Sequence, residues 1–314
     1  MSDDAPTRES LLAGRAELLR RHGIALDALR PHAERLRERE PDAAAQLLAQ
    51  SDGHPLHELL LLDGGLVELL TGAGIERSLG LYVDGPNGPV LACAWALAPN
   101  EAAHVGLRRA VVDEHGNRAW VFGLPGSFGL AGISDVGHAV VGNLLRPAAA
   151  GPGVVGSAAL RRVLAAADMM QARAVIETVD LADGRNWMLA DGQNFLGFEQ
   201  LGGERLLTRV GHKTGHVHAN HCFDPSLRQR EALPRSAPSF RRLELATTIY
   251  VQKRPTTAEA VLAFFDEVEA AAFADAEARA STLLAVELLT GRALWRRDAG
   301  AAFEHVALKS HDIR

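Results

Sequence analysis

The pattern of hydrophobic and polar positions changes character near residue 75. Before that point apolar residues recur at helical spacing, which predicts three helices over residues 9–21, 27–49 and 56–70. Gly72 and Gly74 follow the third stretch and are expected to end it. The chain therefore begins with a helical segment.

From residue 78 the pattern changes to short apolar stretches separated by Gly, Pro and Asn, which is typical of strands joined by turns. The expected strands cover residues 78–85, 88–99, 104–112, 118–126, 186–192, 195–202 and 205–211, with a glycine-rich turn and another strand in 129–145 and more strands from 282 onward. Helical periodicity returns over 157–182 and 256–273, and residues 224–242, rich in Pro and charge, are expected to form an exposed loop. Groups of strands interrupted by helices favour a layered α+β domain over alternating βαβ units.

Composition narrows the function classes. The 314 residues are 47% hydrophobic and 23% charged, as in an ordinary globular protein. A net charge of −6 argues against a nucleic-acid partner, because phosphate binding needs a surplus of Lys and Arg. Two cysteines imply no disulfide framework, and the polar N-terminus and the lack of a long apolar run predict neither a signal peptide nor a membrane span. We therefore expect a cytoplasmic protein.

The densest group of candidate ligands is the segment 212–222, HKTGHVHANHC. Its histidines 212, 216, 218 and 221 stand beside Cys222, and histidine is a common zinc ligand, so a metal site is one interpretation. In a strand, however, His216 and His218 share one face while His221 lies on the other, and no nearby carboxylate completes a known zinc motif. Polar residues packed at a strand end are the second interpretation.

A third interpretation comes from a resemblance. His218–Cys222, HANHC, resembles the HTNH(C) signature of the acyl-CoA:6-aminopenicillanate acyltransferase family of N-terminal nucleophile (Ntn) hydrolases. Other stretches resemble that family in the same order: PVLACAW at 89–95, residues 128–145, residues 153–155 with the following helix that carries Arg161, residues 186–199, and RASTL at 279–283. The similarity runs from about Ser78 to the C-terminus.

The resemblance implies a four-layer αββα fold and a precursor that cuts itself. In the family the residue after the cut is the nucleophile, and its freed α-amine is the base. An α-amine has a pKa of about 7.7–8.0, close to the operating pH, so it can accept the proton of the nucleophile. Residues 1–77 would then be a helical pro-region, and residues 78–314 the Ntn-type domain.

The same resemblance implies the site residues. The family's spacing, counted back from Ala96, leads to Ser78, where the family has a cysteine; other Ntn hydrolases use serine. Asn220 matches the oxyanion-hole asparagine, whose side-chain N–H groups stabilise developing negative charge. Arg279 matches an arginine close to the nucleophile, which would bind a substrate carboxylate or hold the N-terminal strand. The substrate-binding candidates in the matching stretches are Trp95, Ser134, Asn143 and His218.

The sequence departs from the family on the side that positions the nucleophile. Ala94 and Ala96 replace polar residues of the second strand, and Ser134 replaces an asparagine. Three possibilities stay open: Ser78 is a nucleophile with altered support, the chain is an impaired homologue that binds a small molecule, or Cys93 is the nucleophile. A cysteine in the middle of an apolar strand is more often a small buried hydrophobe, which counts against the third possibility.

Other conspicuous residues have structural explanations. The four tryptophans are expected in the core or in pocket walls, and Asp191 and Glu199, near turns, on the solvated surface. The predicted function is a self-cleaving amidohydrolase or acyltransferase that acts on a small amide or thioester, with acyl-CoA as a candidate donor, through an acyl-Ser78 intermediate. We expect no cofactor and no metal.

Overall fold

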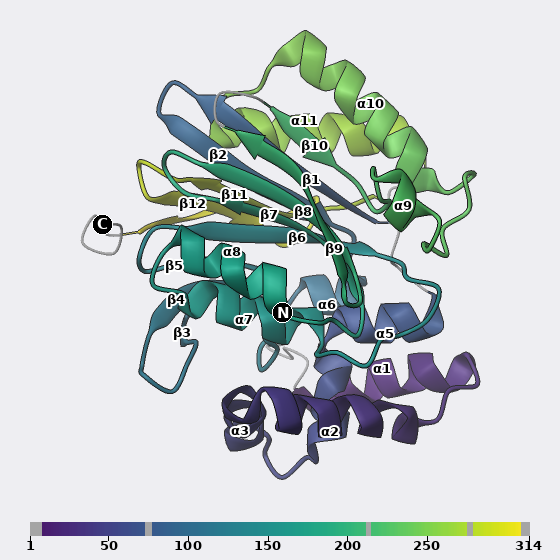
Figure 1. The fold of residues 1–314 in the computed structure, drawn as a ribbon. Coiled ribbons are helices and arrows are strands. Elements are labelled where there is room, and N and C mark those ends of the chain that lie inside the picture. Colours follow the sequence, from purple (N-terminus) through teal and green to yellow (C-terminus); the bar gives the residue numbers. More distant parts are fainter. Residues whose placement is uncertain (1–7, 73–76, 212–214, 275–278, 309–314) are drawn as a thin grey trace.

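Two antiparallel β-sheets form the centre of the protein in the computed structural model, which describes residues 8–72, 77–211, 215–274 and 279–308 (Figure 1). The first sheet has the order β10-β1-β2-β11-β12-β13, with β1 at Ser78–Gly85, β2 at Gly88–Trp95, β10 at His216–His218, β11 at Thr282–Glu287, β12 at Arg292–Arg296 and β13 at Glu304–Ala307. The second runs in sequence order from β3 to β9, with β3 at Gly106–Val111, β4 at Arg118–Gly123, β5 at Ala131–Ser134, β6 at Ala139–Leu145, β7 at Gly184–Ala190, β8 at Phe195–Leu201 and β9 at Glu204–Gly211.

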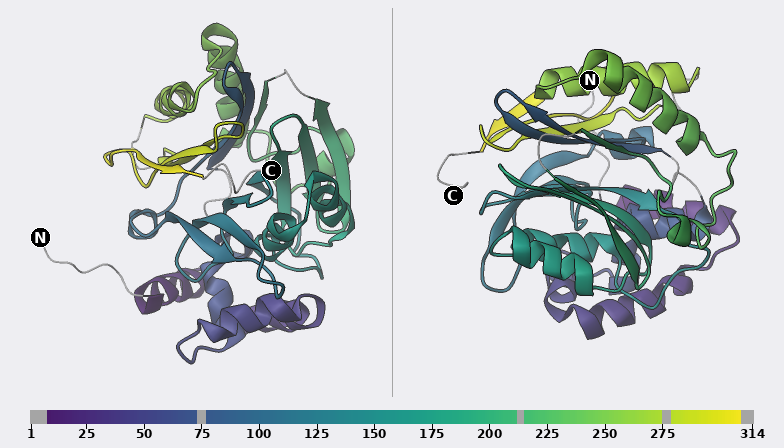
Figure 2. Two further views of the ribbon diagram at one scale, coloured as in Figure 1. Left: turned by 90° about the vertical axis from the view of Figure 1, so that its left-hand side faces the viewer. Right: turned by 45° about the horizontal axis from the view of Figure 1, so that its top comes forward.

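Helices cover the outer face of each sheet (Figure 2). Helices α10 (Pro238–Lys253) and α11 (Ala258–Ala272) pack on the first sheet, and α7 (Gly156–Ala165) and α8 (Met169–Thr178) pack on the second. Alternation along β1 explains the first contact, because Leu79, Leu81 and Val83 point to one face and share a cluster with α11. The predicted four-layer αββα arrangement is confirmed.

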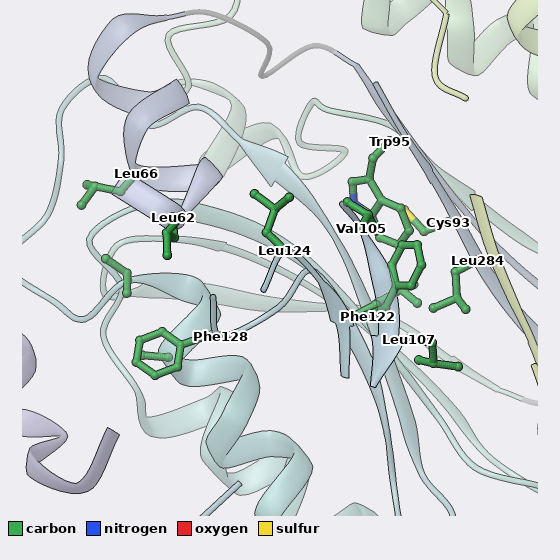
Figure 3. Packing of buried hydrophobic residues seen from close by; sticks show 14 of the residues in the cluster. Leu62, Leu66, Cys93, Trp95, Val105, Leu107, Phe122, Leu124, Phe128 and Leu284 are labelled. Atoms are coloured by element: carbon green, nitrogen blue, oxygen red, sulfur yellow. The ribbon is translucent and has the colours of Figure 1, made fainter. Parts of the chain in front are cut away.

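The inner faces of the two sheets pack against each other (Figure 3). Tyr82 of β1 stacks on Phe195 of β8, with ring centroids 4.2 Å apart, and Trp95 of β2 lies 5.5 Å from Phe122 of β4. Gly80 lets the sheets approach closely, because a Cβ atom there would lie 2.6 Å from Met188 Sδ. This close approach brings residues of both sheets together beside the start of β1.

The N-terminal segment is helical, as predicted, and packs on one edge of the two-sheet body (Figure 1). It contains α1 (Arg8–Arg21), a 3₁₀ turn η1 (Leu26–Leu29), α2 (Arg30–Arg39), α3 (Pro41–Ala49), α4 (Leu56–Leu59), a second 3₁₀ turn η2 (Leu60–Leu62) and α5 (Gly64–Thr71). The stretch expected as one helix over 27–49 divides at Glu40, because Pro41 cannot continue a helix and instead begins α3. Asp63 caps α5 by accepting the backbone N–H of Leu66 at 2.8 Å.

The expectation of an exposed loop over 224–242 holds only for the middle of that stretch, because residues 229–237 lie outside helices and most of them are exposed. The stretch contains the short helix α9 (Pro225–Arg228) and the start of α10, where Pro238 occupies the first turn that tolerates proline. Arg242 is fully buried and pairs with Glu269 of α11 at 2.8 Å. Pro238 and the charged Arg242 therefore belong to the buried start of a helix and not to a loop.

Two further boundaries differ from the prediction. Residues 129–145 hold the two strands β5 and β6, and the stretch expected to be helical over 157–182 holds α7 and α8, the second of which ends at Thr178. A last short helix, α6 (Pro99–Ala102), follows β2. In the described ranges no helix combines the length and apolar character that a bilayer crossing requires.

Candidate active site

Ser78 is the first residue of β1 and pairs with Trp95, the last residue of β2. It is 5% exposed, and its hydroxyl lies between two asparagine side chains from different parts of the fold. Asn220 Nδ2 lies 2.6 Å from Ser78 Oγ, and the Asn143 amide lies 3.1 Å from it. The structure thus brings together three of the residues that the sequence singled out.

Asn220 contacts Ser78 twice. Its Oδ1 accepts the backbone N–H of Ser78 at 2.7 Å, while its Nδ2 donates to Ser78 Oγ and to the carbonyl of Leu144 at 2.9 Å. Its own backbone N–H donates to Ser239 Oγ at 2.9 Å. These bonds define which end of the amide faces the hydroxyl, and this end is a hydrogen-bond donor.

Asn143 reaches the site from the other sheet, on β6. Asn186 of β7 is its direct cross-strand partner and donates to Asn143 Oδ1 at 3.0 Å. With the Asn143 amide turned over, its oxygen instead accepts from Ser78 Oγ at 3.1 Å and from Leu79 N at 3.2 Å. Sequence reasoning missed Asn186, although its stretch was among those that resemble the family.

The peptide bond that precedes Ser78 is also fixed by a backbone hydrogen bond. The carbonyl of Arg77 accepts the backbone N–H of Ala96 at 2.8 Å, which extends the β1–β2 ladder by one bond. Among the described residues, the partners of the Ser78 hydroxyl are two neutral amides, neither of which can act as a general base at neutral pH. The contacts of the Ser78 hydroxyl in the described residues therefore include no general base.

A cavity opens beside Ser78 between the two-sheet body and the N-terminal segment. Its lining is mainly apolar and includes Trp95 and Leu124 from the body and Leu62 from η2, which Figure 3 shows near one another. The space for water centres inside it is about 40 Å³, enough for a few water molecules. Residues of the N-terminal segment, among them Leu62, Asp63 and Glu68, form one wall of this cavity.

Charged residues at the wall of this cavity are mutually paired. Arg15 of α1 donates to Glu101 at 2.6 Å, and Arg185 of β7 pairs with Asp183 at 3.0 Å. Burial raises the pKa of Asp183 to about 6 and that of Glu68, on α5, to about 8, against the opposing effect of nearby arginines. The Arg15–Glu101 pair joins segments far apart in the chain and could not be read from the sequence, whereas Asp183 and Arg185 are neighbours that the sequence prediction did not single out.

Asp63 adds a direct bond between the two parts of the chain. Its carboxylate accepts the Ser157 hydroxyl of α7 as well as capping α5, and both side chains are buried. The N-terminal segment is thus attached to the body by buried polar contacts beside the site.

The remaining predicted site residues have different placements. Trp95 lines the cavity and its Nε1 donates to the carbonyl of Gly142 at 3.4 Å. Ser134 is the last residue of β5, and its N–H donates to the carbonyl of His138 across the β5–β6 turn. His138 lies five residues before Asn143, which is roughly 16 Å along the strand direction. Ser134 therefore lies at the opposite end of that hairpin from Ser78.

His218 and Arg279 do not line the cavity either. His218 is fully buried, and its Nε2 lies 2.7 Å from Glu199 Oε1. Arg279 donates to the carbonyls of Phe273 and Ala274, beyond the end of α11. Both residues contact protein groups rather than the space beside Ser78.

The histidine-rich segment packs as an aromatic cluster. His218 stacks on Phe223 at 4.3 Å, and His221 stacks on Phe240 at 4.0 Å. Burial, followed by the positive charge of His218, lowers the pKa of both His216 and His221 to about 3. In the ranges that the structure describes, which omit His212, no three His, Cys, Asp or Glu side chains are arranged to hold a metal ion.

Cys93 and the two alanines that replace polar family residues also have clear positions. Cys93 is fully buried between the sheets, and burial raises the pKa of its thiol well above the usual value. Ala94 points to the opposite face of β2, into the cluster beneath α10 and α11, while Ala96 lines the cavity. The placement of Glu199 on the solvated surface was wrong, since it is fully buried, whereas Asp191 does cap an exposed turn.

Comparison with known proteins finds similar solved structures at low sequence identity. No protein-family model and no curated protein matches the chain. A mutant of the conjugated bile acid hydrolase from Clostridium perfringens matches at 12% identity and a TM-score of 0.48, over 75% of this chain and 94% of that one. Penicillin V acylase from Agrobacterium tumefaciens matches at 13% and 0.46, over 75% and 93%. The Caenorhabditis elegans N-acylethanolamine-hydrolyzing acid amidase ortholog matches at 11% and 0.45, over 67% and 93%. A function for this chain must therefore be argued from its own site.

Proposed function

We propose that the chain is an Ntn-type amide hydrolase or acyltransferase whose nucleophile is Ser78. One observation carries this proposal: the Ser78 hydroxyl and backbone nitrogen both bind Asn220, and no histidine or carboxylate is bonded to the hydroxyl in the described residues. A serine without such a partner needs another base, and a freed α-amine on the same residue is the nearest group that could supply one.

The proposed activation is a cut between Arg77 and Ser78. Ser78 Oγ attacks the Arg77 carbonyl carbon, the C–N bond breaks, and the Ser78 nitrogen takes up the proton that the hydroxyl loses. Water then hydrolyses the resulting ester and leaves a free α-amine. The N–H of Ala96, 2.8 Å from the Arg77 oxygen, would stabilise the negative charge that develops there.

In the proposed mature enzyme the α-amine accepts the Ser78 proton while the hydroxyl attacks an acyl substrate. Asn220 Oδ1 already lies 2.7 Å from this nitrogen and would orient it, and Asn220 Nδ2, 2.6 Å from Ser78 Oγ, would donate to the oxyanion of the attacked acyl group. Acylation releases an amine or a thiol, and water or an acceptor amine then takes the acyl group. The apolar lining beside Trp95 favours an apolar acyl group.

In this proposal residues 1–77 are the pro-region and residues 78–314 the catalytic domain. Arg279 and His218 are left out of the catalytic set, because their hydrogen bonds go to other protein groups. The donor class, an amide or a thioester such as acyl-CoA, stays a prediction.

The test uses a panel of amides and thioesters with apolar acyl groups, with hydrolysis and acyl transfer measured for the wild type, Ser78→Ala and Ser78→Cys. The proposal expects no turnover for Ser78→Ala, some for Ser78→Cys, and a wild-type mass increase of one acyl group on the peptide that begins at Ser78. Full activity in Ser78→Ala would overturn it.

A non-catalytic binding protein is the competing function. It is favoured by Ala96, an apolar residue where the resembling family has a carboxylate at the wall of the site. That function predicts an uncut chain that binds acylated small molecules without turning them over.

A further inference from the structure

Asn220 belongs to a segment, residues 218–224, that follows the three-residue edge strand β10. An edge strand this short offers few ladder bonds: β10 pairs with β1 at three positions. The precise placement of the Asn220 amide on Ser78 must therefore depend on contacts outside the ladder.

Glu199 of β8 supplies such contacts from the opposite sheet. Its Oε1 accepts His218 Nε2 at 2.7 Å and the backbone N–H of Phe223 at 2.5 Å, and its Oε2 accepts the N–H of Asp224 at 3.0 Å. These three donors lie on both sides of Asn220 in sequence. One fully buried carboxylate therefore fixes both ends of the segment that carries the amide.

His218 extends this anchor toward Asn220. Its Nδ1 lies 2.6 Å from the carbonyl oxygen of Ala219, the residue before Asn220, while its Nε2 faces Glu199. Both ring nitrogens thus face acceptors, and a ring that donates at both is a positively charged imidazolium. A buried ion pair with its hydrogen bonds satisfied holds a fixed geometry, because breaking it would leave a buried charge unpaired.

The anchor also lies in register with the nucleophile. Across the second sheet Asn143 pairs with Asn186, and Asn186 pairs with Glu199. Directly paired residues project to the same face of a sheet, so these three side chains form one polar row facing β1. The row begins at the Ser78 hydroxyl and ends at the carboxylate that holds the Asn220 segment.

We infer that Glu199 is a positioning residue, which holds the Asn220 amide on Ser78 through the His218 ring and the backbone N–H groups of Phe223 and Asp224. The inference rests on the proposed function, since it gives Glu199 its effect on catalysis through Asn220. Glu199 itself touches none of the reacting atoms in the proposed reaction.

Glu199→Gln is the sharpest perturbation, because it keeps the size of the side chain. The carboxylate accepts at both oxygens, whereas an amide must turn an NH₂ group either toward Asp224 N–H or toward the N–H groups of His218 and Phe223. In either orientation the NH₂ group of the glutamine faces an N–H group, and two hydrogen-bond donors cannot bond to each other. Glu287→Gln is the matched control, since Glu287 is also buried and also accepts a backbone N–H, at Ala258, but lies on β11 away from this segment.

Two readouts separate positioning from folding in general. We expect Glu199→Gln to lower kcat on the best amide of the panel about tenfold with KM within about twofold, and to add little to the loss in Asn220→Ala, because residues that act through one group are not additive. We also expect its Asn220 side-chain amide signals in ¹⁵N NMR, assigned by comparison with Asn220→Ala, to move toward those of a solvent-exposed amide. Glu287→Gln should change neither readout.

The inference is overturned if the Asn220 amide signals of Glu199→Gln match those of the wild type, or if its kcat loss adds fully to that of Asn220→Ala. If Glu199→Gln does not fold, Glu199→Asp is measured in the same way. This variant keeps the charge but shortens the side chain by one methylene group. A wild-type protein that turns over no amide or thioester refutes the proposed function, and the NMR signals alone then decide the positioning role.

Discussion

The Asn220 side chain has two proposed roles at the site, and a substitution at this position can separate them. Asn220→Asp keeps an oxygen 2.7 Å from the Ser78 nitrogen but replaces the donor that faces Ser78 Oγ and the Leu144 carbonyl. The variant thus retains the group that orients the proposed α-amine and loses the donor for the oxyanion. It also brings a negative charge to the position where negative charge would develop.

The size of the effect follows from these contacts. Loss of one oxyanion-hole donor lowers kcat by about 10²–10³, or about 2.7–4 kcal/mol of transition-state stabilisation, and the added charge makes Asn220→Asp at least as impaired. Asn220→Ala removes all three side-chain bonds and leaves the Ser78 N–H and the Leu144 carbonyl buried without that partner. At about 1–3 kcal/mol for each of these two unpaired groups, it should lose about 2–6 kcal/mol of unfolding free energy.

The assay is the rate of acyl-enzyme formation at saturating substrate, followed by intact mass, together with urea denaturation of each variant. Gln252→Glu, the same amide-to-carboxylate change at an exposed position of α10, is the control and should match the wild type in the rate and, to within about 0.5 kcal/mol, in stability. If Asn220→Asp acylates within about threefold of the wild-type rate, Asn220 is not the oxyanion donor and the reasoning from its geometry is wrong.

Three further predictions concern stability and the alternative nucleophile. Burial raises the pKa of Glu68 from 4.5 to about 8, so the folded chain keeps this proton longer than the unfolded chain and loses stability as the pH rises between those values. Glu68→Gln should therefore be about 1–2 kcal/mol more stable than the wild type in urea at pH 8, discounted for partial exposure, and show no gain at pH 4.5; equal stability at pH 8 would contradict this. Gly85→Ala places a Cβ atom 2.0 Å from the Thr256 carbonyl and should cost about 2–3 kcal/mol. Gly14→Ala on α1 places a Cβ atom no closer than 3.8 Å to Asn100 Nδ2, an ordinary contact, and should gain up to about 1 kcal/mol; the reverse order in thermal unfolding would refute the packing argument. Cys93→Ser should keep at least half of the wild-type acylation rate, and loss of acylation in a folded variant would return Cys93 to consideration as the nucleophile.

Local patterns were sufficient for much of the fold. The bounds of β1 agree with the sequence prediction, because alternating apolar residues end at a Gly-Pro-Asn-Gly turn that joins β1 to β2. The helical character of residues 8–72 was also readable from leucine spacing. Helix α10 was not, because it begins with proline and buries Arg242, whose charge is acceptable there only through Glu269 on another helix.

The site was partly readable for a similar reason. Asn143 and Asn220 stood in stretches that resemble a known family, and the structure brings both to Ser78. Glu199 appeared to be an ordinary surface acid, since its three partners lie about 20 residues further along the chain and nothing local marks them. The closing of the cavity by the N-terminal segment likewise depends on long-range contacts that periodicity does not encode.

The proposed function depends most on the cut that would free the α-amine of Ser78. The measurement that tests it is the intact mass, under denaturing conditions, of the freshly purified full-length protein, with Ser78→Ala as the control. For the wild type, the proposed function predicts two fragments, residues 1–77 and 78–314, whose masses sum to that of the chain plus one water. For Ser78→Ala it predicts a single uncut chain. A wild-type protein that stays one uncut chain, or that is cut before Cys93 instead, would contradict it.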